Sequence, residues 1–347
     1  MLGVLITGCS MHSKDLIDVL RDNYDGEEIR VVGINCSDTA LLRNGVDAGY
    51  VVPRIDDPNY IQIVIDICKK EHVDVIFPFI TAELPIMAKN RKRFEDEGIQ
   101  VSVSSLESLE KAGNKVVLSA MYPELMPKQV VVKSKADILK FADQVGYPSV
   151  PFCCKLPNRC GGLGFAIVDE INGKDLSIVN KFGMNRYITL DMLFTYYEAC
   201  HDELILQTYE EGVDYSVCVL ADHGECLYMC GFEAPSMSYG SAMYAAISKN
   251  DMAYEITERV IRETGIDGNA CCDFIVKPDG TAILLEVNPR LSATLPFIAR
   301  AGINMPYLRA KQLLGHNVKG LDLPVNYNLC MSKNYQSEYF EASHEER

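Results

Sequence analysis

Two carboxylates, one carboxamide and one guanidinium stand near the C-terminal end of the sequence, within two apolar segments. Asp273 lies in the first segment, and Glu286, Asn288 and Arg290 follow in the second at intervals of two residues. This spacing places Glu286 and Asn288 on one face of a strand, because successive side chains point to opposite faces. Carboxylate and amide oxygens are ligands that Mg²⁺ prefers, and the planar guanidinium binds phosphate or carboxylate. The residues therefore indicate a metal site beside an anion site.

The two apolar segments are predicted to pair as a β-hairpin. The sequence Pro-Asp-Gly at 278–280 lies between them and is typical of a tight turn. Pairing would allow Asp273, on the partner strand, to face Glu286 and Asn288. The alternative is a hairpin whose polar face is only solvated. Because the strands are otherwise strongly apolar, and inward polar groups need partners, the spacing favours the metal site.

A glycine-rich loop at 159–164 lies between two predicted strands, the first of which ends at Lys155. Glycines allow backbone N–H groups to close around phosphate oxygens, and the lysine adds a positive charge. The loop differs from a Walker A motif, which places Gly-Lys-Ser/Thr at the start of a helix. A flexible hairpin turn explains this loop about as well as a phosphate site does.

The segment 204–216 consists of a buried strand, a polar connection and a second strand. Its backbone is able to hydrogen-bond the edge of an adenine, and an acidic side chain in it is able to hold ribose hydroxyls. An ordinary surface loop has the same composition, and the residues alone favour that interpretation.

The first 103 residues alternate predicted strands with predicted helices. The strands are predicted at 4–6, 31–34, 50–53, 73–77 and 101–103, and the helices at 15–20 and 60–71. This alternation predicts a doubly wound parallel sheet. The turn after the first strand lacks the Gly-x-Gly-x-x-Gly spacing of dinucleotide-binding folds, which argues against a nicotinamide or flavin site.

The rest of the sequence is predicted to be an α+β region. Ser105 is the predicted N-cap of one helical segment at 105–122. Strand patterns then outnumber helical ones, until an amphipathic helix at 251–264 precedes the hairpin. From about residue 333 the sequence is polar and acidic and is predicted to form a poorly ordered tail.

Composition excludes some classes of function. The net charge of −15 disfavours a general nucleic-acid binder, which needs a basic surface. No apolar run approaches the roughly 20 residues of a membrane span, and the N-terminus lacks the pattern of a signal peptide. The 13 cysteines are odd in number and show no zinc-type spacing, so reduced thiols in a cytoplasmic protein are expected.

Taken together and in this order, the segments resemble the ATP-grasp superfamily. The resemblance is greatest to stand-alone proteins similar to the large chain of carbamoyl-phosphate synthase. Its specific part is the element Glu286-x-Asn288-x-Arg290 with Asp273 upstream, and the glycine-rich loop and residues 207–214 support it.

The resemblance implies a fold of mixed α/β and α+β class, in which an N-terminal doubly wound parallel sheet precedes a two-subdomain ATP-grasp fold. The implied divisions are a Rossmann-like pre-ATP-grasp domain at 1–103, an ATP-grasp domain at 104–330 with a lid at about 125–206 and a metal-binding subdomain at about 207–320, and a tail at 331–347.

The resemblance also implies roles for single residues, with ATP and Mg²⁺ (or Mn²⁺) as cofactors. The implied metal ligands are Asp273, Glu286 and Asn288, and the implied catalytic residues are Arg290 and Lys155. The implied nucleotide contacts are Lys115, Lys155, Arg159, Gly161, Gly162, Gly164, Gln207, Thr208, Tyr209 and Asp214.

Within this set, Lys115 and Lys155 are expected at the phosphates, and 159–164 as a mobile loop over the β- and γ-phosphates. Residues 207–209 are expected to contact adenine, and Asp214 the ribose. Two positions depart from the family pattern: Asn114 stands where aspartate is common, and Thr208 where glutamate is common.

The implied activity is that of an ATP-dependent carboxylate–amine (or thiol) ligase, whose partners are ATP and small carboxylate and amine substrates. The carboxylate attacks the γ-phosphate, and a nucleophile captures the resulting acyl phosphate. Two alternatives stay open: a kinase that phosphorylates a stable acceptor, and a non-catalytic ATP-binding protein. A homodimer is compatible with each of these functions.

Overall fold

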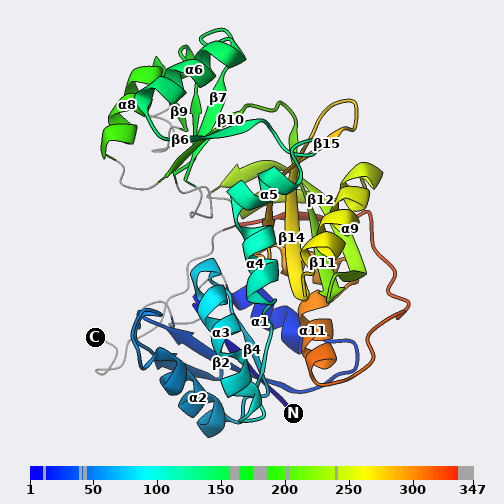
Figure 1. Cartoon of the computed structure of the whole chain (residues 1–347). Coiled ribbons are helices and arrows are strands. Elements are labelled where there is room, and N and C mark those ends of the chain that lie inside the picture. The colour runs from blue at the N-terminus through cyan, green and yellow to red at the C-terminus, as the bar shows by residue number, and fades with distance from the viewer. Residues whose placement is uncertain are drawn as a thin grey trace.

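Three β-sheets organise the chain in the computed structural model (Figure 1). The structure describes residues 1–10, 13–38, 41, 45–156, 164–174, 186–199, 203–238 and 241–334. Within these residues no helix is both long enough and apolar enough to cross a membrane.

The N-terminal sheet has the strand order β3-β2-β1-β4-β5, and all its pairs are parallel. Its strands are β1 (Leu2–Ile6), β2 (Ile29–Asn35), β3 (Ala48–Val51), β4 (Val75–Phe77) and β5 (Gln100–Val101). Its helices are α1 (Lys14–Arg21), α2 (Tyr60–Glu71) and α3 (Leu84–Glu95), with a short 3-10 helix, η3 (Thr81–Glu83), before α3. The predicted parallel sheet is confirmed. The strand order reverses between β1 and β4, the place where open sheets of this kind bind ligands.

Two helices, α4 (Leu106–Gly113) and α5 (Lys115–Met121), occupy the segment predicted as one helix. Ser105 caps α4 as expected, because its side chain accepts a hydrogen bond from the Ser108 N–H. The prediction of an unbroken helix is wrong, since Asn114 adopts an extended conformation and caps α5. Asparagine favours such caps because its side chain bonds the free N–H groups of a first turn.

The second sheet, ordered β6-β10-β7-β8-β9, belongs to a smaller unit that Figure 1 shows set apart from the rest of the chain. Its strands are β6 (Gln129–Val132), β7 (Phe152–Lys155), β8 (Ala166–Val168), β9 (Tyr187–Ile188) and β10 (Leu204–Thr208). The helices α6 (Lys135–Val145) and α8 (Leu190–Ala199) cover it, with the short η4 (Asn172–Lys174) after β8. This unit has its own apolar cluster, which includes Phe141, Phe152 and Leu206.

The third sheet is antiparallel, with the order β15-β14-β11-β12-β13-β16. Its strands are β11 (Val213–Asp222), β12 (Glu225–Ser238), β13 (Ser241–Ile247), β14 (Gly268–Val276), β15 (Ala282–Asn288) and β16 (Cys330–Ser332). Its helices are α9 (Asp251–Thr264), α10 (Leu295–Arg300) and α11 (Met305–Leu313). The predicted hairpin is present as β14 and β15, and Gly280 in its turn has φ +86°, a conformation that favours glycine.

The C-terminal segment differs in part from the predicted tail. Strand β16 pairs with β13, so the third sheet extends to Ser332, past the boundary expected at residue 330. Residues 335–347 lie outside the described residues.

The N-terminal unit and the third sheet share one apolar cluster. Leu16 and Leu20 of α1 belong to it together with Phe297 of α10 and Leu308 of α11. Apolar side chains of both units are buried in this one cluster, which stabilises both units at once. The first and third sheets are therefore expected to move together, and the smaller unit is attached to them.

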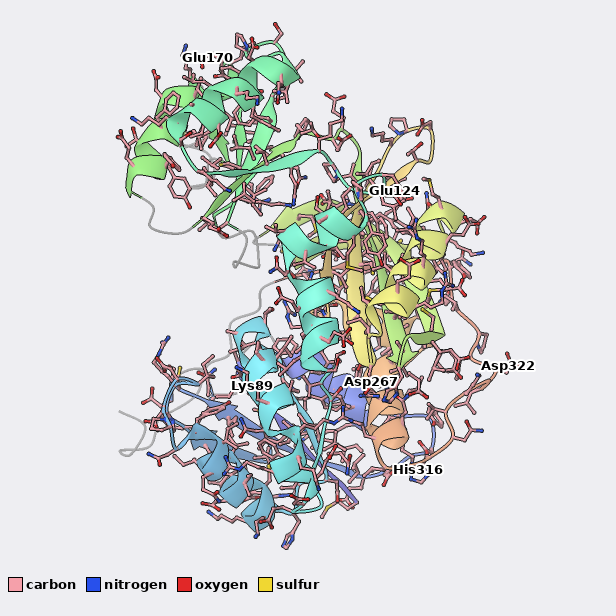
Figure 2. The ribbon with its side chains drawn as sticks, viewed as in Figure 1. Lys89, Glu124, Glu170, Asp267, His316 and Asp322 are labelled. Atoms are coloured by element: carbon pink, nitrogen blue, oxygen red, sulfur yellow. The ribbon has the colours of Figure 1, made fainter. Side chains whose placement is uncertain are left out.

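A buried ion pair lies at this junction, where Figure 2 labels Asp267 beside α11. The guanidinium of Arg309, 1% exposed, donates to both carboxylate oxygens of Asp267 at 2.8 and 3.1 Å. Its Nε atom also donates to Ser102, and the Ser104 hydroxyl donates to the Asp267 carbonyl oxygen. Ser102 and Ser104, which follow β5, are thereby connected to Asp267 at the start of β14.

Replacing Arg309 by methionine is expected to destabilise the chain by about 3–5 kcal/mol. The buried Asp267 carboxylate would lose both of its short hydrogen bonds to Arg309, and Arg91, 3.7 Å away, would not replace them. The measurement is chemical denaturation followed by circular dichroism. The matched control is Arg259→Met, which removes exposed pairs with Glu124 and Glu263 and should shift the denaturation midpoint far less. Equal midpoint shifts for the two variants would contradict the importance of the buried pair.

Candidate active site

The hairpin of β14 and β15 brings three predicted metal ligands into contact. The Asn288 Nδ2 group donates to Asp273 Oδ2 at 2.8 Å and to Glu286 Oε1 at 3.0 Å. Asp273 and Glu286 are register partners, and the register shifts directly after Asp273. Such a bulge redirects side chains relative to a regular ladder. All three side chains are half-buried, so two carboxylates and an amide share one partly desolvated position.

The sequence dictates this placement through alternation along β14. Ala270, Cys272 and Phe274 face the apolar cluster between the sheet and α9. Asp273 therefore faces the opposite side, together with Cys271. On the neighbouring strand β11, Ser216 is the register partner of Asp273, and its hydroxyl donates to Asp273 Oδ1 at 2.7 Å. Sequence reasoning missed Ser216, although two adjacent strands with a polar residue at matched positions would have indicated it.

Crowding of negative charge changes the acidity of the carboxyls. Burial and then the neighbouring Glu286 raise the pKa of Asp273 to about 7. Burial alone would raise the pKa of Glu286 as well, but Lys115, Asn288 and Lys155 together lower that pKa below its ordinary value. A carboxyl with a raised pKa beside a charged one is typical of a site that accepts a cation.

Two predicted lysines on two other elements act electrostatically on Glu286, and one of them contacts it. Lys115, the first residue of α5, places its Nζ 3.0 Å from Glu286 Oε2. Lys155, the last residue of β7, is 9% exposed, and burial lowers its pKa to about 8, with Glu286 opposing the shift. Among the described residues Lys155 has no hydrogen-bond or ion-pair partner. A buried ammonium without such a partner is suited to bind an anion.

The predicted adenine-binding segment begins beside Lys155. Gln207 and Thr208 end β10 and pair with Cys153 and Phe152 of β7. Gln207 is buried, and its Oε1 atom has no hydrogen-bond partner among the described residues.

The Thr208 hydroxyl donates a hydrogen bond to Glu210 Oε1 at 3.0 Å. The Glu210 side chain therefore also lies at the polar connection between β10 and β11. Tyr209 is half-buried directly after β10, and Asp214 is exposed on β11. The contacts of these residues with a nucleotide stay a prediction.

Most of the predicted glycine-rich loop belongs to the part of the chain that is not described. Arg159, Gly161 and Gly162 lie outside the described residues. Gly164 is described, and it has φ +73° immediately before β8. This left-handed conformation requires glycine where the chain enters the strand.

Arg290 lies at the junction with the N-terminal sheet. Its Nε donates to the Thr81 hydroxyl at 2.8 Å, and its Nη1 donates to the Leu291 carbonyl oxygen at 2.8 Å. Thr81 follows β4, at the edge where the strand order of the N-terminal sheet reverses.

The buried Glu83 lies close behind Thr81. It accepts hydrogen bonds from the hydroxyls of Thr7 and Tyr60, and burial raises its pKa. Arg290 is therefore oriented by a residue of the N-terminal unit. The Glu83 contacts also hold the carboxyl ends of β1 and β4 together beside Thr81.

Comparison with known families accounts for this arrangement. A model described as "PylC-like, N-terminal domain" matches residues 4–102, and one described as "ATP-grasp in the biosynthetic pathway with Ter operon" matches residues 201–334. The chain thus carries an ATP-grasp domain after a PylC-like N-terminal domain.

A curated relative of this ATP-grasp protein is the arginine-specific carbamoyl phosphate synthase large chain of Halalkalibacterium halodurans. It is 22% identical over 317 residues, which are 86% of this chain and 29% of the relative. The ATP-grasp protein thus spans less than a third of the length of that relative.

Solved structures show the same fold. One is the biotin carboxylase domain of Hydrogenobacter thermophilus 2-oxoglutarate carboxylase, solved with MgADP, ADP and bicarbonate. It has 16% identity and a TM-score of 0.66, over 93% of the ATP-grasp protein and 72% of that chain. Another is the L-amino acid ligase of Bacillus licheniformis, with 15% identity and a TM-score of 0.61, over 90% and 74% of the two chains. The predicted ATP-grasp fold is confirmed.

Proposed function

We propose that this protein binds ATP with Mg²⁺ and activates a small carboxylate as an acyl phosphate, which an amine or similar nucleophile then captures. The observation that carries the proposal is the contact of Asp273, Glu286 and Asn288 beside the ammonium groups of Lys115 and Lys155. Cationic groups of α5 and β7 thus accompany the anionic groups of the β14–β15 hairpin, a combination suited to a metal and phosphates. The Hydrogenobacter domain was solved with MgADP, which supports the choice of nucleotide and metal.

The donor set fits a magnesium ion. An amide NH₂ group now lies within 3.0 Å of both carboxylates. Rotation of the Asn288 amide by 180° would present its oxygen instead, and the three side chains would then offer the hard oxygen ligands of Mg²⁺. When bound, the metal would neutralise charge on the transferred phosphoryl group. Ser216 would hold Asp273 in orientation through its hydrogen bond.

Side chains and backbone groups of the protein bind the nucleotide and the acid during the reaction. Lys115 and Lys155 neutralise phosphate oxygens, and the backbone after β10 holds the adenine. A carboxylate oxygen of the substrate attacks the γ-phosphorus, the bond to the bridging oxygen breaks, and ADP leaves. Arg290 binds the acid and then its acyl phosphate. The amine attacks the acyl carbon, phosphate leaves, and the amine proton passes to solvent.

The test is release of ADP and phosphate when the protein meets a panel of small acids paired with amines or thiols. An amide or thioester product identified by mass supports the proposal. A stable phosphorylated acceptor would instead show that the protein is a kinase. Tight ATP binding without turnover across the panel would favour a non-catalytic role.

ATP binding is expected to take up a proton above pH 8. Burial lowers the pKa of the free Lys155 ammonium to about 8, and a bound phosphate would raise it. Well below pH 8 the lysine is already charged, so Lys155 itself should add no pH dependence to the affinity there. Above pH 8 the protein must first gain a proton, so affinity should fall by up to about tenfold per pH unit.

The measurement is isothermal titration calorimetry at about pH 9 in two buffers of different ionisation enthalpy. Wild type should take up nearly one proton per ATP, and Lys155→Gln should take up almost none. The control is Lys140→Gln on the exposed face of α6, which should resemble wild type. Identical uptake by Lys155→Gln would mean that another group titrates.

Two further expectations stay proposals. The cysteines of the described residues are free thiols, which supports a reducing compartment such as the cytoplasm. A homodimer is supported by the Hydrogenobacter domain, which was solved as a dimer. Sedimentation of the purified chain would test the second expectation.

A further inference from the structure

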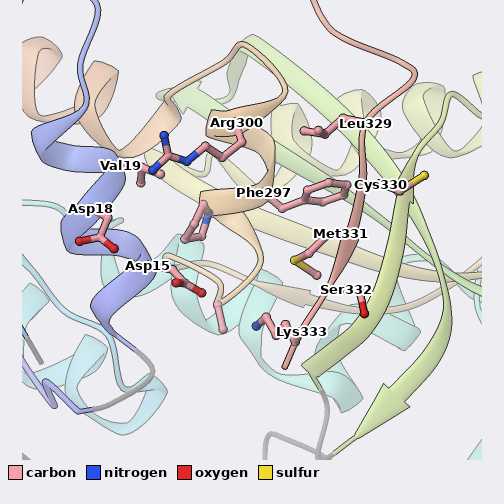
Figure 3. A pocket seen from close by; sticks show the side chains of 12 residues that line it. Asp15, Asp18, Val19, Phe297, Arg300, Leu329, Cys330, Met331, Ser332 and Lys333 are labelled. Atoms are coloured by element: carbon pink, nitrogen blue, oxygen red, sulfur yellow. The ribbon is translucent and has the colours of Figure 1, made fainter. Parts of the chain in front are cut away.

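A cavity of about 350 Å³ lies between α1, α10 and β16 (Figure 3). Its walls come from three places that are far apart in sequence: α1, the segment from Ala293 through α10, and the residues around β16. Its volume is at the lower end of the ~300–1,000 Å³ of small-molecule sites. The cavity is therefore suited to a single small metabolite rather than to a nucleotide.

One part of the wall is apolar. Val19, Pro296 and Phe297 are buried, and Leu329 and Met331 are half-buried at the cavity. Figure 3 shows the side chains of Phe297 and Met331 between α10 and β16. Such walls favour a ligand with an apolar body.

Four charged side chains also line the cavity, and two of them are already paired. Asp18 accepts from Lys14 at 2.8 Å, and Arg300 pairs with Asp22. The other two are Asp15 on α1 and Lys333 after β16.

Asp15 and Lys333 lie at the same end of the cavity on opposite walls (Figure 3). Within the described part of the chain, the Lys333 ammonium is hydrogen-bonded only to the Ser241 hydroxyl, at 3.2 Å, and Asp15 has no hydrogen bond or ion pair. Burial lowers the pKa of Lys333, and Asp15 acts against that shift. The end of the cavity thus offers one carboxylate and one half-buried ammonium to a ligand.

We propose that this cavity binds a small zwitterion with an apolar body, of which an apolar α-amino acid is the simplest example. The ligand's ammonium group would bind Asp15, its carboxylate would bind Lys333, and its side chain would pack on Phe297 and Met331. Opposite charges at one end and apolar walls beyond them match the chemistry of such a molecule. The inference concerns binding and does not depend on the ATP chemistry proposed above.

The experiment is isothermal titration calorimetry of the full chain without ATP, using L-leucine as the probe. Two analogues each lack one charge: 4-methylpentanoate lacks the ammonium group, and 3-methylbutylamine lacks the carboxylate. L-Leucine should bind at least about tenfold more tightly than either analogue, because each analogue leaves one charged wall group unpaired. Equal affinities for the three molecules, or no saturable heat up to about 10 mM L-leucine, would overturn the proposal.

Variants locate the site. Asp15→Asn and Lys333→Met should each weaken L-leucine binding by about tenfold or more. The matched control is Asp18→Asn, which alters a cavity carboxylate that is already paired with Lys14 and should change affinity less than about twofold. Melting curves verify that each variant is folded, and both altered groups are outside the apolar core. Unchanged affinity in Asp15→Asn and Lys333→Met would place L-leucine elsewhere and overturn the assignment, whatever the outcome of ATP turnover assays.

Discussion

Glu286→Gln is expected to lower ATP-dependent turnover by about a thousandfold, which corresponds to ~4 kcal/mol of lost transition-state stabilisation. Glutamine keeps the size of the side chain but removes the negative charge. The space beside Asp273 and Asn288 would then hold a divalent cation poorly, and Lys115 would lose its 3.0 Å partner. The measurement is the steady-state rate of ADP release at saturating ATP, repeated at increasing Mg²⁺.

The control for this variant is Glu258→Gln on the exposed face of α9, which changes the same charge far from the hairpin and should leave turnover intact. Partial recovery of Glu286→Gln at high Mg²⁺ would agree with weakened metal binding. Turnover of Glu286→Gln equal to wild type would remove the carboxylate from the mechanism, and with it the proposed metal site.

Arg290→Lys is expected to lower turnover by about a hundredfold while ATP binds almost as well as in wild type. Arg290 is oriented by hydrogen bonds to Thr81 and to the Leu291 carbonyl oxygen, each 2.8 Å long. A lysine cannot keep both bonds and still present a planar pair of donors to an acid or an acyl phosphate. The value of kcat should therefore fall, and KM for the acid should rise.

The measurements for Arg290→Lys are kcat, KM for the acid and the dissociation constant for ATP. The matched control is Arg259→Lys on α9, where the arginine forms an exposed pair with Glu124. That change should leave all three quantities near wild type. A tenfold or larger loss of ATP affinity in Arg290→Lys would mean that Arg290 binds the nucleotide rather than the acid.

Local patterns were sufficient to predict the central hairpin. Two apolar segments around a Pro-Asp-Gly turn pair with each other, and the intervals of two residues place Glu286 and Asn288 on one face. The parallel N-terminal sheet was predictable for the same reason, because its strands and helices alternate along the sequence. In both cases neighbouring residues in sequence determine the structure.

Long-range contacts at the site could not be predicted in the same way. Thr81 and Arg290 are 209 residues apart, and nothing in either local pattern indicates that they bond. The pairing of Lys115 with Glu286 likewise depends on how α5 packs beside the hairpin. The break at Asn114 was missed because the helical pattern continues through it, although asparagine at a helix start favours a cap.

The cavity beside α10 illustrates the same limit. Asp15 and Lys333 are separated by almost the whole chain, and each looks like an ordinary surface charge in its own segment. The two charges come to line one cavity only because α1 packs against α10 and β16 pairs with β13. Sites built from three distant segments require the tertiary structure.

The central claim is that a carboxylate oxygen attacks the γ-phosphate of ATP, and transfer of oxygen isotope tests it most directly. The acid that supports turnover in the panel would be supplied with both carboxylate oxygens as ¹⁸O, and the released phosphate analysed by mass spectrometry. Formation and capture of an acyl phosphate leaves one acid oxygen on the phosphate, so each released phosphate should carry one ¹⁸O. Phosphate without ¹⁸O, released while product accumulates, would contradict activation of the carboxylate by ATP.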